Sequence, residues 1–194
     1  TVTRAVILPY DPKNAIPISD TNKVSLTEFI KTFQAEEIKF ERFDFNHPLY
    51  ILFSSGTTGI PKCIVHGAGG TLIQHLKDHL LQTDVKPGDR VFYFTTLGWM
   101  MWNWLVSGLA AKATIILYDG SPFYPDGNSL FDFAEKAKVT HFGTSAKFID
   151  SVKNAKLKPK NTHNLSSIRV LMSTGSPLVP ESFDFIYENI KSDI

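Results

Sequence analysis

The sequence predicts an α/β fold in which a mostly parallel sheet is flanked by helices. From residue 90 onward, short apolar segments alternate with longer segments of helical periodicity. Alternation at this spacing is typical of parallel strands joined by right-handed crossovers through helices. The chain has 194 residues, of which 43% are hydrophobic and 20% charged, so it is long enough to enclose a sizeable core.

In the first part of the chain, apolar runs predict strands and helical spacing predicts helices. Ser25 is a candidate N-cap because Glu28 follows three residues later, which is the spacing of a capping box. Five apolar residues recur at helical spacing and predict one helix, namely Leu72, Ile73, Leu76, Leu80 and Leu81. In chain order we expect a strand over 2–8, a loop over 9–23, a helix over 25–34, strands over 50–53 and 63–66, and a helix over 70–83.

After a turn at residues 86–89, strand and helix alternate to the end of the chain. Ligands of parallel α/β sheets bind outside the carboxyl ends of the strands. The residues that follow the strands, namely Ser54, Trp99, Asp119, Thr144 and Gly175, are therefore expected to meet at one edge of the sheet. The expected strands are 90–95, 114–118, 140–143 and 167–172, and the expected helices are 99–111, 129–138, 145–155 and 180–191.

Composition argues against several classes of partner. The net charge is only +1, and no basic stripe predicts a nucleic-acid partner. The apolar stretch 97–118 is interrupted by Asn103, Ser107 and Lys112, so we expect a buried helix and strand there and no membrane span.

Cys63 is the single cysteine, which excludes an intrachain disulfide and favours a reducing, cytosolic setting. The absence of an initial Met suggests a piece of a longer protein.

The most informative segment lies directly after the apolar run 50–53. It reads Ser54-Ser55-Gly56-Thr57-Thr58-Gly59-Ile60-Pro61-Lys62. Its two glycines let backbone N–H groups approach an anion, its four hydroxyls add donors, and its lysine adds a positive charge. We therefore predict a polyphosphate site. The spacing does not fit the Walker A pattern, and the alternative interpretation is a flexible glycine-rich hairpin turn.

This segment resembles the phosphate-binding loop of the adenylate-forming acyl-CoA synthetases. Residues 63–70, Cys-Ile-Val-His-Gly-Ala-Gly-Gly, resemble the short-chain members, and segments 53–82, 98–104, 117–122 and 171–178 extend the likeness over nearly the whole chain. The resemblance implies that residues 1–194 are part of the large N-terminal AMP-binding domain. It also implies that the small C-terminal lid domain and the adenylation lysine lie outside this chain, so that the isolated chain lacks turnover.

The resemblance further implies the reaction and its substrates. Acetoacetate would attack the α-phosphate of ATP to give an acyl-adenylate and pyrophosphate, and coenzyme A would then displace AMP to give acetoacetyl-CoA. Magnesium would accompany the nucleotide, and no metal ligand is assigned in this chain. Alternatives are a ligase for acetate or propionate, and a non-catalytic nucleotide-binding module.

Several residues receive expected roles from this resemblance. Thr57, Thr58 and Lys62 would neutralise charge on the leaving pyrophosphate, and Ser54, Ser55, Gly56 and Gly59 would bind the nucleotide. The turn Gly175-Ser176-Pro177 would pack against adenine. Taken alone, this turn is better explained as an ordinary strand-to-helix loop, and the predicted phosphate site favours the adenine role. Trp99, Met100 and Met101 would shape a short acyl pocket, with Asn103 as a candidate donor to the 3-oxo group.

Two further expectations concern histidines and core residues. His75 and His79 are four residues apart on one predicted helix, but no glutamate-zinc signature surrounds them. We therefore expect a solvent-facing pair. Trp104 and Leu105 are expected in the core, and Cys63 is expected to be a small filler in the strand after the loop.

Overall fold

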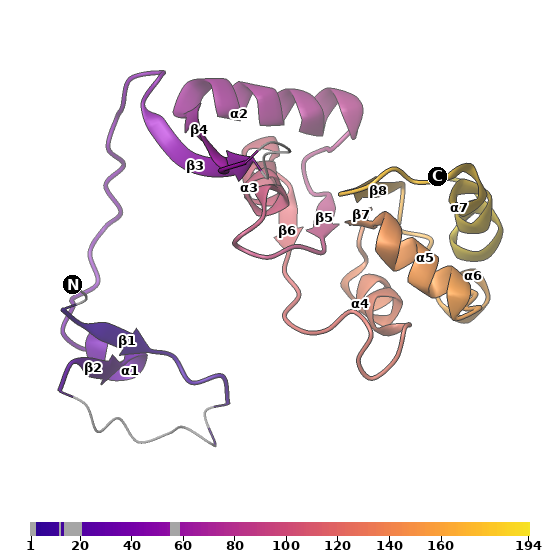
Figure 1. Cartoon of the computed structure of the whole chain (residues 1–194), viewed down its shortest axis with the longest axis horizontal. Coiled ribbons are helices and arrows are strands. Elements are labelled where there is room, and N and C mark those ends of the chain that lie inside the picture. The colour runs from indigo at the N-terminus through magenta and orange to yellow at the C-terminus, as the bar shows by residue number, and fades with distance from the viewer. Residues whose placement is uncertain (1–2, 12, 14–20, 55–58) are drawn as a thin grey trace. The chain divides into compact units, whose positions relative to one another are not determined.

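The computed structural model describes residues 3–11, 13, 21–54 and 59–194. It contains two compact units, residues 1–42 and 43–194, each with strands and helices (Figure 1). The predicted α/β class is confirmed. Residues 55–58, which include Gly56, Thr57 and Thr58, lie outside the described part of the chain.

The first unit is a small strand pair with one short helix. Strand β1 (Ala5–Ile7) pairs in parallel with β2 (Lys23–Ser25), and helix α1 (Leu26–Ile30) follows directly. The Ser25 hydroxyl accepts a hydrogen bond from the backbone N–H of Glu28 at 3.1 Å. The N-cap prediction is therefore confirmed, although the helix ends sooner than expected and β2 is too short to be seen in the sequence pattern.

The second unit begins with an antiparallel hairpin. Strand β3 (Pro48–Ser54) pairs with β4 (Lys62–Gly67), with Ser54 opposite Lys62. Both strands were predicted, but the prediction that Ser54 leaves a strand of the parallel sheet is wrong. The hairpin is a separate two-stranded sheet. The short connection between the strands explains the difference, because a few residues can reverse a chain but cannot form a parallel crossover.

A four-stranded parallel sheet forms the centre of the second unit. Its spatial order is β6-β5-β7-β8, and all three neighbouring pairs are parallel. The bounds are β5 (Arg90–Tyr93), β6 (Thr114–Ile116), β7 (His141–Ser145) and β8 (Val170–Thr174). The predicted alternation is thus confirmed, with strand ends shifted by a few residues.

Helices lie before, between and after these strands. Helix α2 (Ala68–Lys77) continues into the π-helical turn η2 (Asp78–Gln82), and α3 (Met100–Ser107) continues into the 3₁₀ turn η3 (Gly108–Ala111). The later helices are α4 (Ser129–Ala137), α5 (Ala146–Asn154), α6 (Pro159–Thr162) and α7 (Pro180–Phe185), which continues into the π-helical turn η4 (Ile186–Ile190). Of these helices only α6 was not predicted, since its four residues are too few to show periodicity.

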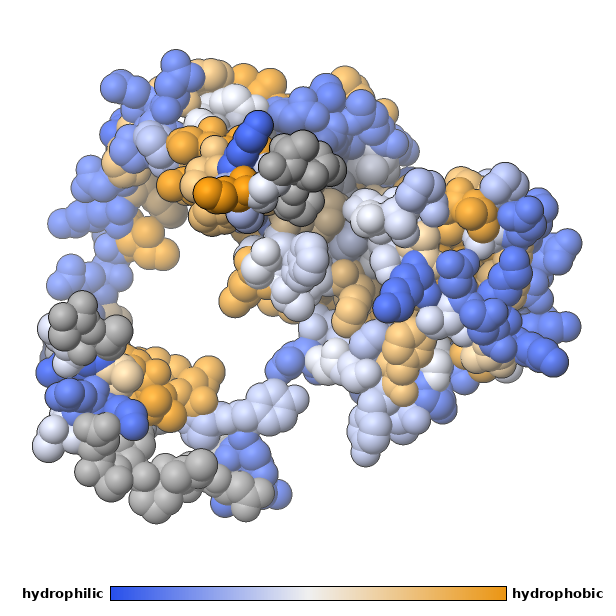
Figure 2. Space-filling model, in the orientation of Figure 1, coloured by the Kyte–Doolittle hydropathy of each residue, from blue (hydrophilic) through white to orange (hydrophobic). Residues whose placement is uncertain are grey.

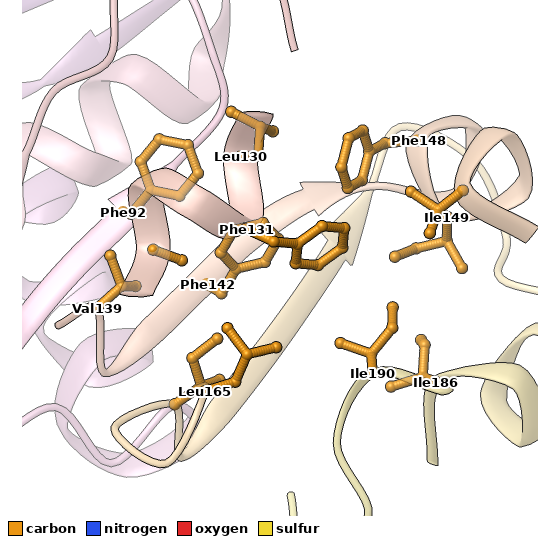
Figure 3. Packing of buried hydrophobic residues seen from close by; sticks show 13 residues of the cluster. Phe92, Leu130, Phe131, Val139, Phe142, Phe148, Ile149, Leu165, Ile186 and Ile190 are labelled. Atoms are coloured by element: carbon orange, nitrogen blue, oxygen red, sulfur yellow. The ribbon is translucent and has the colours of Figure 1, made fainter. Parts of the chain in front are cut away.

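Side chains that alternate along β5 divide the core into two clusters. Phe92 packs in the cluster that includes Phe131, Phe142 and Ile149 from α4, β7 and α5 (Figure 3). Val91 and Tyr93 point to the opposite face, where they pack with Trp104 and Leu105 of α3. The period of two along a strand therefore places α3 and α4 on opposite faces of the sheet.

Large hydrophobic side chains remain exposed along one face of the hairpin. Leu49, Ile51 and Phe53 of β3 are 53%, 54% and 68% exposed. Val65, the partner of Ile51 across the hairpin, is 57% exposed. Figure 2 shows hydrophobic surface in this part of the molecule. Within the described ranges, no helix has both the length and the apolar character needed to cross a membrane.

Candidate functional site

The carboxyl ends of β7 and β8 bring two predicted segments together. Thr144 lies beside Ser173 in the register of these strands, and Ser145 lies beside Thr174. The hydroxyl oxygens of Thr144 and Ser173 are both buried, and neither has a hydrogen-bond partner among the described residues. The turn that begins at Gly175 therefore leaves the sheet next to the start of α5, as the sequence predicted.

The turn at Gly175 requires glycine. Its φ of +93° lies in a region that side chains with a Cβ rarely adopt, and a Cβ added here would meet no atom of the described residues within 4 Å. Ser176 and Pro177 are exposed beside it. A backbone that is open on one side and free of a side chain gives a flat group close access to the peptide plane. The adenine-binding role of this turn stays a prediction.

The predicted phosphate loop closes the tip of the β3–β4 hairpin. Its described ends are Ser54 and Gly59 to Lys62, and the remaining predicted site residues Ser55, Gly56, Thr57 and Thr58 lie outside the described residues. Gly59 has a φ of +140°, again a conformation that favours glycine. Lys62 is exposed and lies opposite Ser54 in the register of the hairpin, and its phosphate-binding role stays a prediction.

The three predicted acyl-pocket residues have different environments. Trp99 is 70% exposed and caps the start of α3, whereas Met101 packs against the cluster around Trp104. Met100 is less exposed than Trp99. It lines a hollow of about 480 Å³ together with Trp104 and His75. Trp104 and Leu105 are buried, as expected for core residues.

Asn103, the candidate donor to a 3-oxo group, does not line the hollow that Met100 lines. It borders a second hollow of about 240 Å³ with Trp102, Val106 and Ser107. The two hollows share His75, Tyr50 and Thr71 as lining residues. The structure thus brings His75, and not Asn103, to the hollow beside Met100.

The expectation of a solvent-facing histidine pair is wrong. His79 is fully buried and its ring lies 4.1 Å from that of Trp104, while His75 is 8% exposed. Among the apolar residues at helical spacing, Leu72 and Leu80 are 45% and 46% exposed, whereas Leu76 packs against the cluster of Trp104. Helix α2 and the turn η2 therefore present His75 and His79 to α3. Burial is the main cause that lowers the pKa of both imidazoles below the ordinary value.

Two other side chains also differ from expectation or were missed. Cys63 is exposed on β4 and not a core filler. Ser107, which the sequence showed only as a polar interruption of an apolar stretch, joins His75 and His79 in a hydrogen-bonded cluster. The signal for this cluster was present as three polar residues on two helices, but only the packing of α2 on α3 shows that they meet.

Comparison with known proteins identifies the class to which this fold and site belong. Residues 5–193 match the family of AMP-binding enzymes. Because the match covers almost the whole chain, the protein belongs to that family.

Within this family, the chain is similar to several acetoacetyl-CoA synthetases. The chain is 59% identical to the acetoacetyl-coenzyme A synthetase of Rhizobium meliloti (strain 1021) over 97% of its length, and 47% identical to the acetoacetyl-CoA synthetase of Xenopus tropicalis over 98%. It spans 29% of the length of each of these relatives. The solved acetoacetyl-CoA synthetase from Streptomyces lividans matches 91% of the chain and 27% of its own, with a TM-score of 0.79 and 41% identity.

Proposed function

We propose that this chain forms part of the N-terminal domain of an acid–thiol ligase that activates acetoacetate with ATP and transfers the acyl group to coenzyme A. The observation that carries the proposal is the 59% identity to a relative named acetoacetyl-coenzyme A synthetase. The hydroxyl- and glycine-rich loop between Ser54 and Lys62 supports the use of a nucleoside triphosphate.

The proposed chemistry requires charge neutralisation at the loop. When a carboxylate attacks the α-phosphate, negative charge builds on the departing pyrophosphate, and fixed N–H donors and cations lower the energy of that state. Thr57, Thr58 and Lys62 take this role in the proposal. Ser54, Ser55, Gly56 and Gly59 bind the phosphate chain through backbone amides and hydroxyls.

The other binding roles follow from the sheet edge and from α3. Gly175, Ser176 and Pro177 hold the adenine in this proposal, which the open backbone of Gly175 supports. The acid lies near Trp99, Met100 and Met101, of which Met100 borders the larger hollow. Bulky side chains in these positions limit the length of the acid.

Magnesium enters the proposal as the partner of the nucleotide. In the described part of the chain, no group of three or more His, Cys, Asp or Glu side chains is placed to hold a metal ion. The described residues therefore do not form a magnesium site built from protein side chains alone. We assign its ligands to the triphosphate and to residues outside this chain.

Two observations support the proposal that this chain is only part of a domain: the share of its relatives' length that it spans, and the apolar surface of the hairpin. The chain spans 29% of the length of the relatives, and the hairpin leaves Leu49, Ile51 and Phe53 exposed. We propose that residues 1–194 are a partial AMP-binding domain whose hairpin is covered by the rest of the protein. The isolated chain then lacks turnover. The free exposed thiol of Cys63 suits a reducing cytosolic setting.

The proposed function is tested with the protein encoded by the complete reading frame. Thioester formation is measured with ATP, coenzyme A and, in turn, acetoacetate, acetate and propionate. Preference for acetoacetate supports the proposal, whereas preference for acetate or propionate assigns a different short-chain acid. Absence of any thioester together with ATP binding would identify a non-catalytic nucleotide-binding module.

A matched pair of lysine variants tests the loop in the same protein. Lys62→Ala should weaken ATP binding about tenfold or more, since a charge-assisted hydrogen bond is worth roughly 1.5–3 kcal/mol. Lys136→Ala removes an exposed lysine of α4 and serves as the control. Equal ATP affinity of the two variants in calorimetric titration would contradict the role of Lys62.

A further inference from the structure

Three polar side chains, two of them buried, form a cluster between α3 and the helical segment of α2 and η2. The Ser107 hydroxyl lies 3.0 Å from Nδ1 of His75 and 2.9 Å from Nε2 of His79. It also donates to the backbone carbonyl oxygen of Trp104 at 2.6 Å, and Nε2 of His79 lies 3.0 Å from that same oxygen. One hydroxyl of α3 thus connects two histidines of the preceding helical segment.

The partners determine where the protons of this cluster lie. A carbonyl oxygen only accepts hydrogen bonds, so Nε2 of His79 carries a proton that it shares between Trp104 and Ser107. The Ser107 proton is directed to Trp104, so Nδ1 of His75 is the donor in its contact with Ser107. Burial lowers the pKa of both histidines and so favours the neutral form of each ring. Nδ1 of His79 is then a buried acceptor without a partner in the described part of the chain.

The cluster lies at the wall of the larger hollow. His75 and Trp104 line that hollow with Met100, which is one helical turn before Trp104 on the same face of α3. The His79 ring lies against the Trp104 ring with centroids 4.1 Å apart. The hydrogen bonds and the ring contact therefore fix the part of α3 that carries both wall residues.

The backbone around His79 is itself unusual. Residues 78–82 form a π-helical turn, and the Thr83 N–H donates to the Asp78 carbonyl five residues earlier at 2.9 Å. Single π-helical turns are rare in proteins and occur often at functional sites. The wider turn lies where α2 passes α3, so it helps to set how His79 meets Trp104.

We propose that His75, Ser107 and His79 are positioning residues that hold α3 so that Met100 and Trp104 form one wall of the acid-binding hollow. This inference rests on the proposed function, because it takes this hollow to be the acid site. It assigns acid selectivity to His75, which lines the hollow, and to Ser107 and His79, which do not line it, whereas the sequence suggested Asn103.

Paired substitutions in the complete protein test this proposal. Ser107→Ala removes the central hydroxyl, and His79→Leu removes the shared N–H while Ser107 still satisfies the Trp104 carbonyl. His79→Gln keeps an N–H donor near the position of Nε2. Ser182→Ala is the control, because the buried Ser182 hydroxyl donates to Asp150 at 3.0 Å on the other face of the sheet.

The readout is kcat/KM for the acid that the wild-type protein prefers, divided by kcat/KM for the acid one carbon shorter. Small displacements of a substrate site change rates strongly, so Ser107→Ala and His79→Leu should lower this ratio about tenfold. KM for the acid should rise and KM for ATP should stay unchanged. His79→Gln should keep the ratio within about threefold of wild type, and Ser182→Ala should lower thermal stability without changing the ratio.

Two results would overturn the proposal. One is an unchanged ratio in Ser107→Ala and His79→Leu proteins that are folded at the assay temperature. The other is an equal change in Ser182→Ala, which would indicate a general packing effect. A wild-type protein that prefers an acid other than acetoacetate counts against the proposed function alone, because the ratio is defined by whichever acid is preferred.

Discussion

Gly143 on β7 shows how one missing side chain permits a close contact in the core. A Cβ at this position would overlap the ring of Tyr93, which is buried and packs edge-on against Trp104. The Tyr93 hydroxyl also donates to the Thr144 carbonyl at 2.8 Å. The ring is therefore held at both ends and cannot move aside at low cost.

Gly143→Ala should destabilise the fold by about 1–3 kcal/mol, the usual cost of overpacking a core. The thermal unfolding midpoint measures this effect. Gly70→Ala is the control, because Gly70 lies within α2 and an added Cβ there has no atom of the described residues within 4 Å. Alanine there should raise stability by about 0.5–1 kcal/mol. An unchanged midpoint for Gly143→Ala would show that Tyr93 is free to shift.

Helix α2 and the turn η2 show that contacts between helices decide which side chains are buried. His75 of α2 and His79 of η2 were expected to face solvent, yet both are buried because α3 offers a hydroxyl and a carbonyl as partners. In acid, the unfolded chain binds protons that the buried histidines do not. The depressed folded-state pKa of each ring therefore means that stability falls as pH drops below about 6.5.

The pH prediction is tested by comparing wild type with His79→Gln. Moving from pH 7.5 to pH 5.5 should lower the thermal midpoint of the wild-type protein more than that of the variant. Asp78 partly opposes the effect, since its charge raises the pKa of both rings, whereas His66 lowers that of His75 and His141 that of His79. The same drop in both proteins would assign the acid sensitivity to other groups.

Local sequence patterns predicted the parallel sheet but not the contacts between separate segments. Apolar runs and helical spacing were sufficient for the parallel strands, because the central strands β5 and β7 are mostly buried and each crossover contains a helix. They were insufficient for the β3–β4 hairpin and for the buried face of α2, since both depend on contacts between segments. For the candidate site, the loop 54–62 and the turn at Gly175 were visible as local strings, whereas the meeting of Ser107 with His75 and His79 was not.

In the molecule as a whole, the well-packed sheet contrasts with the exposed hairpin. The four-stranded sheet has buried clusters on both faces, while β3 and β4 expose apolar side chains. If the rest of the protein covers the hairpin as proposed, the exposure of Ile51 differs between the isolated chain and the complete protein. Ile51 is exposed in this chain, and the proposal makes it a buried residue of the complete protein.

The substitution Ile51→Lys tests the proposed coverage, because its effect should differ between the isolated chain and the complete protein. In the isolated chain the added charge should reduce self-association, measured by the concentration dependence of the sedimentation coefficient. In the complete protein the same change should lower stability by about 2 kcal/mol or more, because it would bury an unpaired charge. Equal thermal midpoints of the complete wild-type and variant proteins would contradict the proposed coverage.

The central claim is that the loop between β3 and β4 holds the phosphate chain of ATP. The most direct measurement is a crystal structure of the complete protein with a nonhydrolysable ATP analogue. We expect the β- and γ-phosphates within hydrogen-bonding distance of the backbone amides of residues 55–59 and of the Lys62 ammonium group. Phosphates bound elsewhere, with residues 54–62 facing solvent, would contradict the account.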